Sequence, residues 1–305
     1  MANALNYAKE YSRELAQAFP YVLNFGALYS TDNNNKYRWV NAKTIEIPSI
    51  STTGRVNADR DTIGTKARNY DNAWETKTLT NERKWETLVH PMDIDQTNLV
   101  ASIANITKVY NEEQKFPEMD AYTISKIYAD WGTTTDPVTG SARVADTTVL
   151  TIANVLSVFD ALMLKMDNER VPANGRILYC TFEVKKLLSN ADKISRSIDV
   201  TNNNGVIDRV VSRLDEVEVI GVPAVLMKTA YNFTEGWEVA QNAQQINMCL
   251  VHPTAVITPV SYTFARLDEP SAGSEGKYDY YEESFEDVFI LNKKSGAIQF
   301  NITAE

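Results

Sequence analysis

The stretch Pro91–Trp131 most restricts what this chain can fold into, because its apolar residues recur with the period of an α-helix. Asp93 is a capping residue that predicts the start of the helix, and Gly132 predicts its end because glycine readily adopts the left-handed conformation. Pro117 lacks an amide hydrogen and predicts a bend or a break. Two interpretations stay open: one long bent helix, or two core helices of ordinary length. The apolar positions are Leu99, Ile103, Ile106 and Tyr110, then Met119, Tyr122, Ile127 and Trp131.

A strand pattern precedes this helix, in residues 36–90. The segments YRWV, TIEIPSI and ETKTLTNERKWETLV alternate polar with apolar or β-branched residues, which is typical of β-strands. Between them, Ser51–Asn72 contains too few apolar residues to be buried. We therefore expect a long two-stranded hairpin with an irregular tip. Because such hairpins are marginally stable in isolation, we expect this one to lie on a neighbouring subunit, with a lid over the chain's own body as the alternative.

The other segments mix helices and strands without regular alternation. Residues 1–30 begin with a short amphipathic helix, and Thr148 predicts the cap of a further helix. Arg176–Thr181 predicts a buried strand that a short helix follows from Phe182. Val217–Met227 predicts a strand pair or a bent strand. The pattern as a whole is typical of an α+β fold.

The formal net charge of −10 is unevenly distributed along the chain. Lys36–Glu86 carries ten basic and seven acidic side chains, a net +3, so the rest of the chain carries −13. An acidic chain is poorly suited to grip nucleic acid, because affinity for phosphates comes largely from Lys and Arg. A mildly basic segment on an acidic body favours contact with another acidic surface. We therefore predict inter-subunit contacts by the cations of the hairpin tip: Arg55, Arg60, Lys66 and Arg68.

Residues that could carry catalysis or bind a metal are few. His90 and His252 each adjoin a proline and lack an evident third metal ligand, so we interpret both as structural. Cys180 and Cys249 stand in apolar segments and predict buried thiols. No GxSxG, HExxH, Walker or GxGxxG motif occurs. These observations favour a structural protein over an enzyme, with no catalytic residue, cofactor or metal.

Two further features concern the surface. No apolar run approaches the roughly 20 residues of a membrane helix, so we expect no membrane partner. One acidic run predicts a solvated surface or a rim between subunits rather than a cation site. Its members are Asp268, Glu269, Glu275, Asp279, Glu282, Glu283, Glu286 and Asp287.

The order of these elements resembles the major capsid protein of tailed bacteriophages, with the Hong Kong 97-type fold that encapsulin nanocompartments also use. The stretch VPANGRILYCTFEVKKLL is similar to a turn, strand and helix of such proteins, although Phe182 stands where they have proline. NYAKEYSRELAQAF and VNAKTIEIPSI are similar to the opening of capsid proteins from phages of Gram-positive bacteria.

The resemblance implies an α+β capsid fold with five segments. They are an N-terminal arm (1–35), an extended β-hairpin loop (36–90), a peripheral domain with a spine helix (91–147), an axial domain (148–240) and a return to the peripheral domain (241–305).

The resemblance also implies self-assembly through pentamers and hexamers into an icosahedral shell. The shell would enclose double-stranded DNA, contacted without sequence specificity, in a virion assembled in the bacterial cytoplasm. Because the extended loop begins near residue 36, we expect scaffolding and portal functions to belong to separate proteins. Two alternatives stay open: an encapsulin shell around a cargo enzyme, and an enzyme whose hairpin is an active-site lid.

Overall fold

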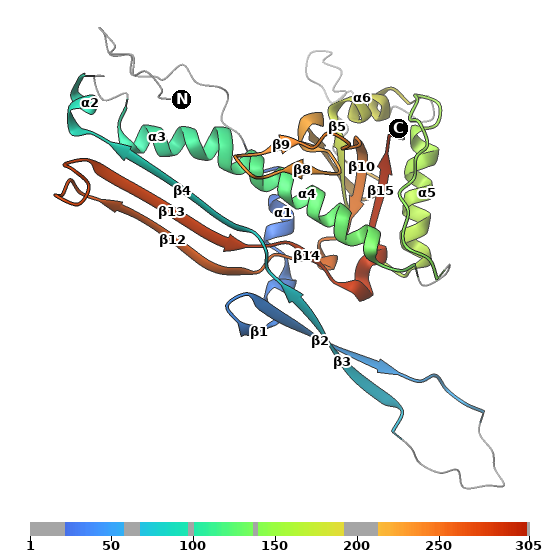
Figure 1. The fold of residues 1–305 in the computed structure, drawn as a ribbon. Coiled ribbons are helices and arrows are strands. Elements are labelled where there is room, and N and C mark those ends of the chain that lie inside the picture. The colour runs from blue at the N-terminus through green and yellow to red at the C-terminus, as the bar shows by residue number, and fades with distance from the viewer. Residues whose placement is uncertain (1–21, 58–67, 97–100, 137–139, 192–212, 304–305) are drawn as a thin grey trace, which may run out of the picture.

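The structure, a computed structural model, describes residues 22–57, 68–96, 101–136, 140–191 and 213–303. Figure 1 shows a long helix that crosses a body of strands and helices, and two β arms that leave this body in different directions. The mixture of elements confirms the α+β class. The amphipathic helix predicted near the N-terminus lies outside the described residues.

The long helix is continuous from Ile103 to Thr133. It consists of α3 (Ile103–Tyr110), a π-helical turn η2 (Asn111–Lys115) and α4 (Phe116–Thr133). The π-turn stands directly before Pro117, where the missing amide would interrupt an α-helical hydrogen-bond ladder. One long helix is therefore confirmed over two separate core helices, and the irregularity expected from Pro117 is a widened turn on its N-terminal side.

The predicted start of this helix is wrong, whereas its predicted end at Trp131 and Gly132 lies within two residues of the observed end at Thr133. Asp93 belongs to a separate short helix, α2 (Pro91–Gln96). The long helix instead begins after Ser102, whose Oγ accepts a hydrogen bond from the Asn105 amide at 3.4 Å. Gly132 lies inside α4 without a positive φ, and the chain leaves the helix at Thr134, which is extended. The Thr134 amide and hydroxyl both donate to the Trp131 carbonyl oxygen, so the helix ends there without a glycine in the left-handed conformation.

A five-stranded sheet forms the centre of the body, in the order β15–β10–β5–β7–β6. Neighbouring strands are antiparallel, apart from the parallel pair β5–β7. The strands are β5 (Ile177–Thr181), β6 (Arg213–Leu214), β7 (Val217–Val222), β10 (Ile246–Val251) and β15 (Ile298–Ile302), and the two helices beside them are α5 (Val155–Asn168) and α6 (Phe182–Asn190).

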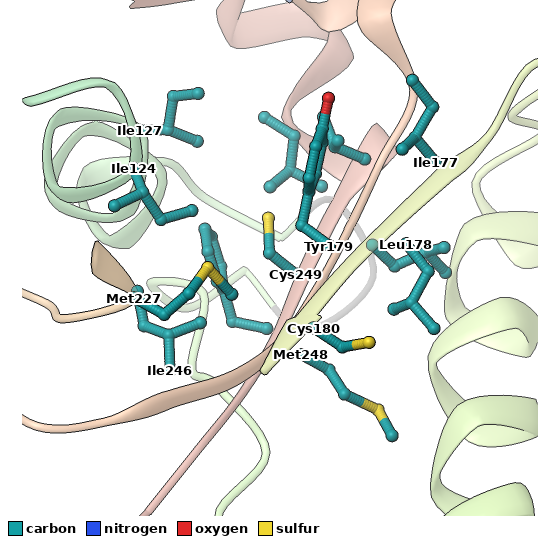
Figure 2. Packing of buried hydrophobic residues seen from close by; sticks show 14 of the residues in the cluster. Ile124, Ile127, Ile177, Leu178, Tyr179, Cys180, Met227, Ile246, Met248 and Cys249 are labelled. Atoms are coloured by element: carbon teal, nitrogen blue, oxygen red, sulfur yellow. The ribbon is translucent and has the colours of Figure 1, made fainter. Parts of the chain in front are cut away.

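Helices cover both faces of this sheet, which explains why every residue of β5 is buried. In Figure 2, Tyr179 and Cys249 face the side of α4, where Ile124 lies, whereas Leu178 and Cys180 point toward α5. Both cysteines are free and buried, as predicted. The predicted strand and following helix are also confirmed, since β5 leads directly into α6.

The start predicted for α5 is wrong. Thr148 does not cap it: the Thr148 hydroxyl donates to Asp146 Oδ1 at 2.9 Å, and the helix begins at Val155 after a turn. The Thr151 amide donates to Asn154 Oδ1 at 2.7 Å, which fixes the entry to the helix. The loop before α5 is thus held by the Asn154 side chain, and no side chain caps the first turn of the helix.

The first arm is a three-stranded antiparallel sheet of β1 (Arg38–Asn41), β2 (Thr44–Thr52) and β3 (Tyr70–Thr78). The pairing of β2 with β3 runs from Thr44–Thr78 at the base to Thr52–Tyr70 near the tip. The predicted hairpin is therefore present, but it has a third strand and ends at Thr78.

The second arm contains β4 (Glu82–Val89), which the sequence assigned to the hairpin. It pairs with β13 (Tyr278–Glu286), and β13 pairs with β12 (Val260–Asp268). The strand pattern through residues 70–89 is thus divided between two sheets. The division falls at Thr80, whose amide donates to Asp287 Oδ2 at 2.8 Å instead of continuing a ladder.

The remaining elements are short. They are α1 (Gly26–Tyr29), η1 (Asp32–Asn35), η3 (Ala224–Leu226), β8 (Tyr231–Asn232), β9 (Glu238–Val239), η4 (Pro253–Ala255), β11 (Val256–Ile257), β14 (Phe289–Ile290) and η5 (Asn292–Ala297).

Candidate functional site: two projecting β arms

The base of the first arm packs on a small hydrophobic cluster that is separate from the main core. Ile45 and Ile47 of β2 pack there with Phe285 and Phe289 from the C-terminal part of the chain. Lys43 adds a cation–π contact, with its Nζ 5.2 Å from the centre of the Phe285 ring. The alternation of buried and partly exposed residues from Thr44 to Ile47 is the pattern of a sheet with one face on a core.

The outer half of the first arm lacks this support. Ile50 is 69% exposed, Tyr70 60% and Trp74 46%. The Arg38 guanidinium covers part of the Trp74 ring at 4.6 Å and also pairs with Glu46 at 2.8 Å. Large apolar side chains on a projecting arm indicate a surface that another molecule covers.

The four predicted contact residues divide between two parts of the chain. Arg55 and Arg68 flank the tip, and both are exposed. The Arg68 guanidinium lies 5.8 Å from the centre of the Tyr70 ring. Arg60 and Lys66 lie outside the described residues. The role predicted for these four cations stays a prediction.

The second arm is attached to the long helix by stacking and by ion pairs. The Trp85 ring of β4 stacks on Tyr110 of α3, with centroids 3.9 Å apart and planes 8° from parallel. Arg83 Nε lies 2.6 Å from Glu118 Oε1, and Lys115 in the π-turn pairs with Glu282 of β13. The helix and the arm therefore form one unit on the side away from the five-stranded sheet (Figure 1).

The acidic run of the sequence lies along this arm. Glu283 accepts a hydrogen bond from the Tyr281 hydroxyl at the surface at 2.6 Å. Asp287 is an exception to the predicted surface position, because it is only 1% exposed and accepts from the Tyr122 hydroxyl at 2.7 Å. Burial also raises the pKa of the Glu286 carboxyl. The run is thus exposed at the outer end of the arm, partly buried along the long helix and fully buried at Asp287.

The groups that could carry chemistry have structural roles where the structure describes them. His252 Nε2 lies 3.1 Å from the Asn174 carbonyl oxygen, and the Met92 amide donates to His90 Nδ1 at 3.1 Å. Burial raises the pKa of the Cys180 thiol to about 12, which leaves it unreactive at neutral pH. Within the described ranges, no group of three His, Cys, Asp or Glu residues is placed to hold a metal ion. None of the described helices is long and apolar enough to span a bilayer.

Sequence reasoning missed several residues that organise these surfaces. Asp287 and the partner strand of β4 had no local signal, because both depend on contacts between distant segments. Lys293 and Lys294 at the base of the first arm were not predicted as site residues. Their only signal is their position directly after the apolar segment that ends at Leu291.

We compared the sequence and the structure with those of known proteins. No protein-family model matches the chain, and no curated protein matches it. Solved structures do match over nearly the whole chain. A chain from Mycobacterium phage Che8 has a TM-score of 0.66 at 12% identity, covering 97% of this chain and 97% of the phage chain.

Two further matches come from named capsids. The mature capsid of bacteriophage PhiM1 gives a TM-score of 0.69 at 10% identity, with 98% of this chain and 93% of that chain covered. The capsid of cyanophage P-SCSP1u gives 0.65 at 13% identity, with 98% and 93% covered. At such low identity the likeness concerns the fold. The chain has the fold of the major capsid proteins of tailed bacteriophages, as the resemblance of its sequence predicts.

Proposed function

We propose that this protein is the shell-forming subunit of a tailed-phage capsid, assembled through pentamers and hexamers into an icosahedral container for double-stranded DNA. The observation that supports this most is the first arm, which projects from the body and exposes the side chains of Ile50, Tyr70 and Trp74. The similarity to solved capsids over nearly the whole chain supports the same function. In this proposal the protein is located in the virion, scaffolding and portal are separate proteins, and the five segments inferred from the resemblance are its parts.

Assembly of the purified protein tests this proposal directly. We expect rings of five or six subunits, or closed shells, in negative-stain microscopy and light scattering. A protein that stays strictly monomeric across concentrations and salts, and that no separate scaffolding protein brings into assembly, would contradict the proposal. An enzyme with a hairpin lid would give that monomeric result, and an encapsulin would give shells that contain a cargo protein instead of DNA.

The cations of the tip provide a second test. We expect the four reversals Arg55→Glu, Arg60→Glu, Lys66→Glu and Arg68→Glu, made together, to slow or abolish assembly while the isolated subunit keeps its melting temperature. Each exposed ion pair contributes only about 0.2–1 kcal/mol, but a shell repeats the contact in every subunit. Particle yield by sedimentation and circular dichroism of the unassembled fraction provide the measurement.

A matched control has the same change in net charge away from the first arm. Reversal of four exposed cations on the body and the long helix should leave assembly much less affected: Lys108, Lys165, Lys186 and Arg213. Full particle yield with the four tip charges reversed would show that the tip does not bind through electrostatics.

A further inference from the structure

A groove of about 560 Å³ lies at the base of the first arm. Ile47 and Pro48 of β2 line one side, and Leu291 and Ile257 line the other. Tyr37 and Leu291 are only partly buried and pack on the small cluster that anchors the arm. The floor of the groove is therefore apolar and continuous with a core, but open to solvent.

Three lysines stand around this apolar floor: Lys36, Lys293 and Lys294. Their ammonium groups donate to neutral oxygens. Lys293 Nζ lies 3.1 Å from the Ile50 carbonyl oxygen, Lys294 Nζ 3.0 Å from the Thr254 carbonyl oxygen, and Lys36 Nζ 2.9 Å from Asn33 Oδ1.

The positive charge of the groove is not balanced within the described side chains. No ion pair joins these three lysines to any described carboxylate, and Glu75 at the rim pairs with Lys77 at 3.0 Å. Partial burial lowers the pKa of Lys294, and the positive charge of Lys36 lowers it further. A carboxylate entering the groove would relieve this repulsion and form charge-assisted hydrogen bonds.

The second arm has the complementary character. Residues 260–286 contain seven acidic and two basic side chains, a net charge of −5. The same segment exposes large apolar side chains, with Tyr262 47%, Phe264 38% and Leu267 48% exposed. At its outer end the exposed Leu267 is followed by Asp268 and Glu269. Asp268 pairs with Arg266 at 2.5 Å and Glu275 with Lys277 at 3.2 Å, so Glu269 is the carboxylate of this end without an ion pair among the described residues. Surface pairs of this kind are weak and can exchange partners at an interface.

The lysine-lined groove and the outer end of the second arm are too far apart to meet within one chain. Figure 1 shows the outer end of the second arm, where β12 turns toward β13, at the far end of that arm from the base of the first arm. An apolar floor ringed by lysines thus lies where the two arms leave the body, and the outer end of the second arm projects away from it. A contact of this kind joins different surfaces of two copies and can repeat around a ring.

We propose that the lysine-lined groove at the base of the first arm receives the acidic outer end of the second arm from a neighbouring copy of the chain. Lys293 and Lys294 bind its carboxylates, and the apolar floor of the groove receives Leu267. The inference rests on the proposed function, because it requires contact between copies.

Zero-length cross-linking of wild-type particles tests the contact without any substitution. A carbodiimide joins a carboxylate to an amine only when the two are in direct contact. Particles assembled from equal amounts of ¹⁴N- and ¹⁵N-labelled protein should yield mixed-isotope peptides that link Lys293 or Lys294 to Asp268, Glu269 or Glu275. If cross-links form elsewhere between copies but none involves these lysines, the inference is wrong.

A charge exchange gives the second test. The variant Lys293→Glu/Lys294→Glu and the variant Asp268→Lys/Glu269→Lys should each bind neighbouring copies about tenfold more weakly, as expected for the loss of two or more ion pairs. The chain that carries all four substitutions should regain most of the wild-type particle yield. Lys165→Glu/Lys186→Glu, with the same change in net charge on the body, should assemble normally.

The outcomes separate the two proposals. If wild-type protein forms no particles, even with a separate scaffolding protein, the proposed function fails and the inference fails with it. If wild-type protein assembles and Lys293→Glu/Lys294→Glu assembles equally well, only the inference fails. If the four-residue chain stays as defective as its parents while its circular dichroism is native, the two charged surfaces do not meet and the inference is overturned.

Discussion

At the scale of single residues, His252 is held in its neutral form. The Thr254 amide donates to His252 Nδ1 at 3.3 Å, and the Asn174 carbonyl oxygen lies 3.1 Å from Nε2, so one tautomer satisfies both contacts. Burial lowers the pKa of His252 below its ordinary value of 6.5, and the charges of Lys294 and Arg176 lower it further. A second proton on the ring would remove the acceptor for Thr254.

This arrangement predicts a pH dependence of stability. Because the pKa of His252 is lower in the folded than in the unfolded chain, the unfolded chain binds more protons, and stability is lost as the pH falls below about 6.5. We expect the melting temperature of His252→Asn to vary less between about pH 7.5 and about pH 5.5 than that of the wild type. Thermal unfolding, monitored by circular dichroism, gives the melting temperatures. If the melting temperature changes with pH equally in both proteins, His252 does not cause the pH dependence.

Asp287 is a second residue whose contacts predict a measurable effect. Its carboxylate accepts from the Tyr122 hydroxyl at 2.7 Å, the Val288 amide at 2.8 Å and the Thr80 amide at 2.8 Å. Asp287→Ala removes the acceptor from the buried Val288 amide, from the partly buried Tyr122 hydroxyl and from the Thr80 amide, and should lower the free energy of unfolding by about 2–4 kcal/mol. Urea denaturation measures this change in the free energy of unfolding. Glu283→Ala, in the same acidic run but at the surface, should cost less than about 1 kcal/mol.

At the scale of elements, the π-turn before Pro117 is the feature to test. Pro117 cannot donate to the preceding turn, and the wider π-turn accommodates its ring. Pro117→Ala restores an amide, so we expect η2 to convert to regular α-helix and the direction of α3 relative to α4 to change. The subunit should fold normally but form fewer particles, or particles of aberrant size.

Electron microscopy of particle diameters and circular dichroism of the subunit provide the measurement for Pro117→Ala. Because Lys115 within the turn pairs with Glu282, the second arm should move with the helix. Particles of wild-type size and yield would show that the π-turn has no part in assembly.

At the scale of the whole molecule, the distribution of charge predicts weak binding of DNA. The chain has a net charge of −10, and everything outside Lys36–Glu86 carries −13. Tight binding of duplex DNA requires many cations on phosphates. We expect fluorescence anisotropy with a labelled random duplex to give no Kd below about 1 μM near physiological salt, where non-specific binding is ordinarily weak. A sub-micromolar Kd would contradict a container whose wall leaves DNA free to move.

Local patterns were sufficient for the elements that bury a continuous apolar face. The apolar run of β5, the helix that begins at Phe182 and the periodic face of the long helix are all visible in the sequence, because a buried strand or helix must carry apolar residues at its own period. The projecting first arm was also predictable, since its tip contains too few apolar residues to be buried.

Contacts between distant segments decided the rest. Nothing near Glu82–Val89 shows that this strand pairs with β13, almost two hundred residues later in the sequence, rather than extending the first arm. The burial of Asp287 and the gathering of Lys36 with Lys293 and Lys294 arise in the same way. The sequence alone thus determined which segments are helical, extended or exposed, because those properties follow from local periodicity. Only the tertiary structure decided which segments meet, because strand pairing and charge clustering depend on neighbours in space.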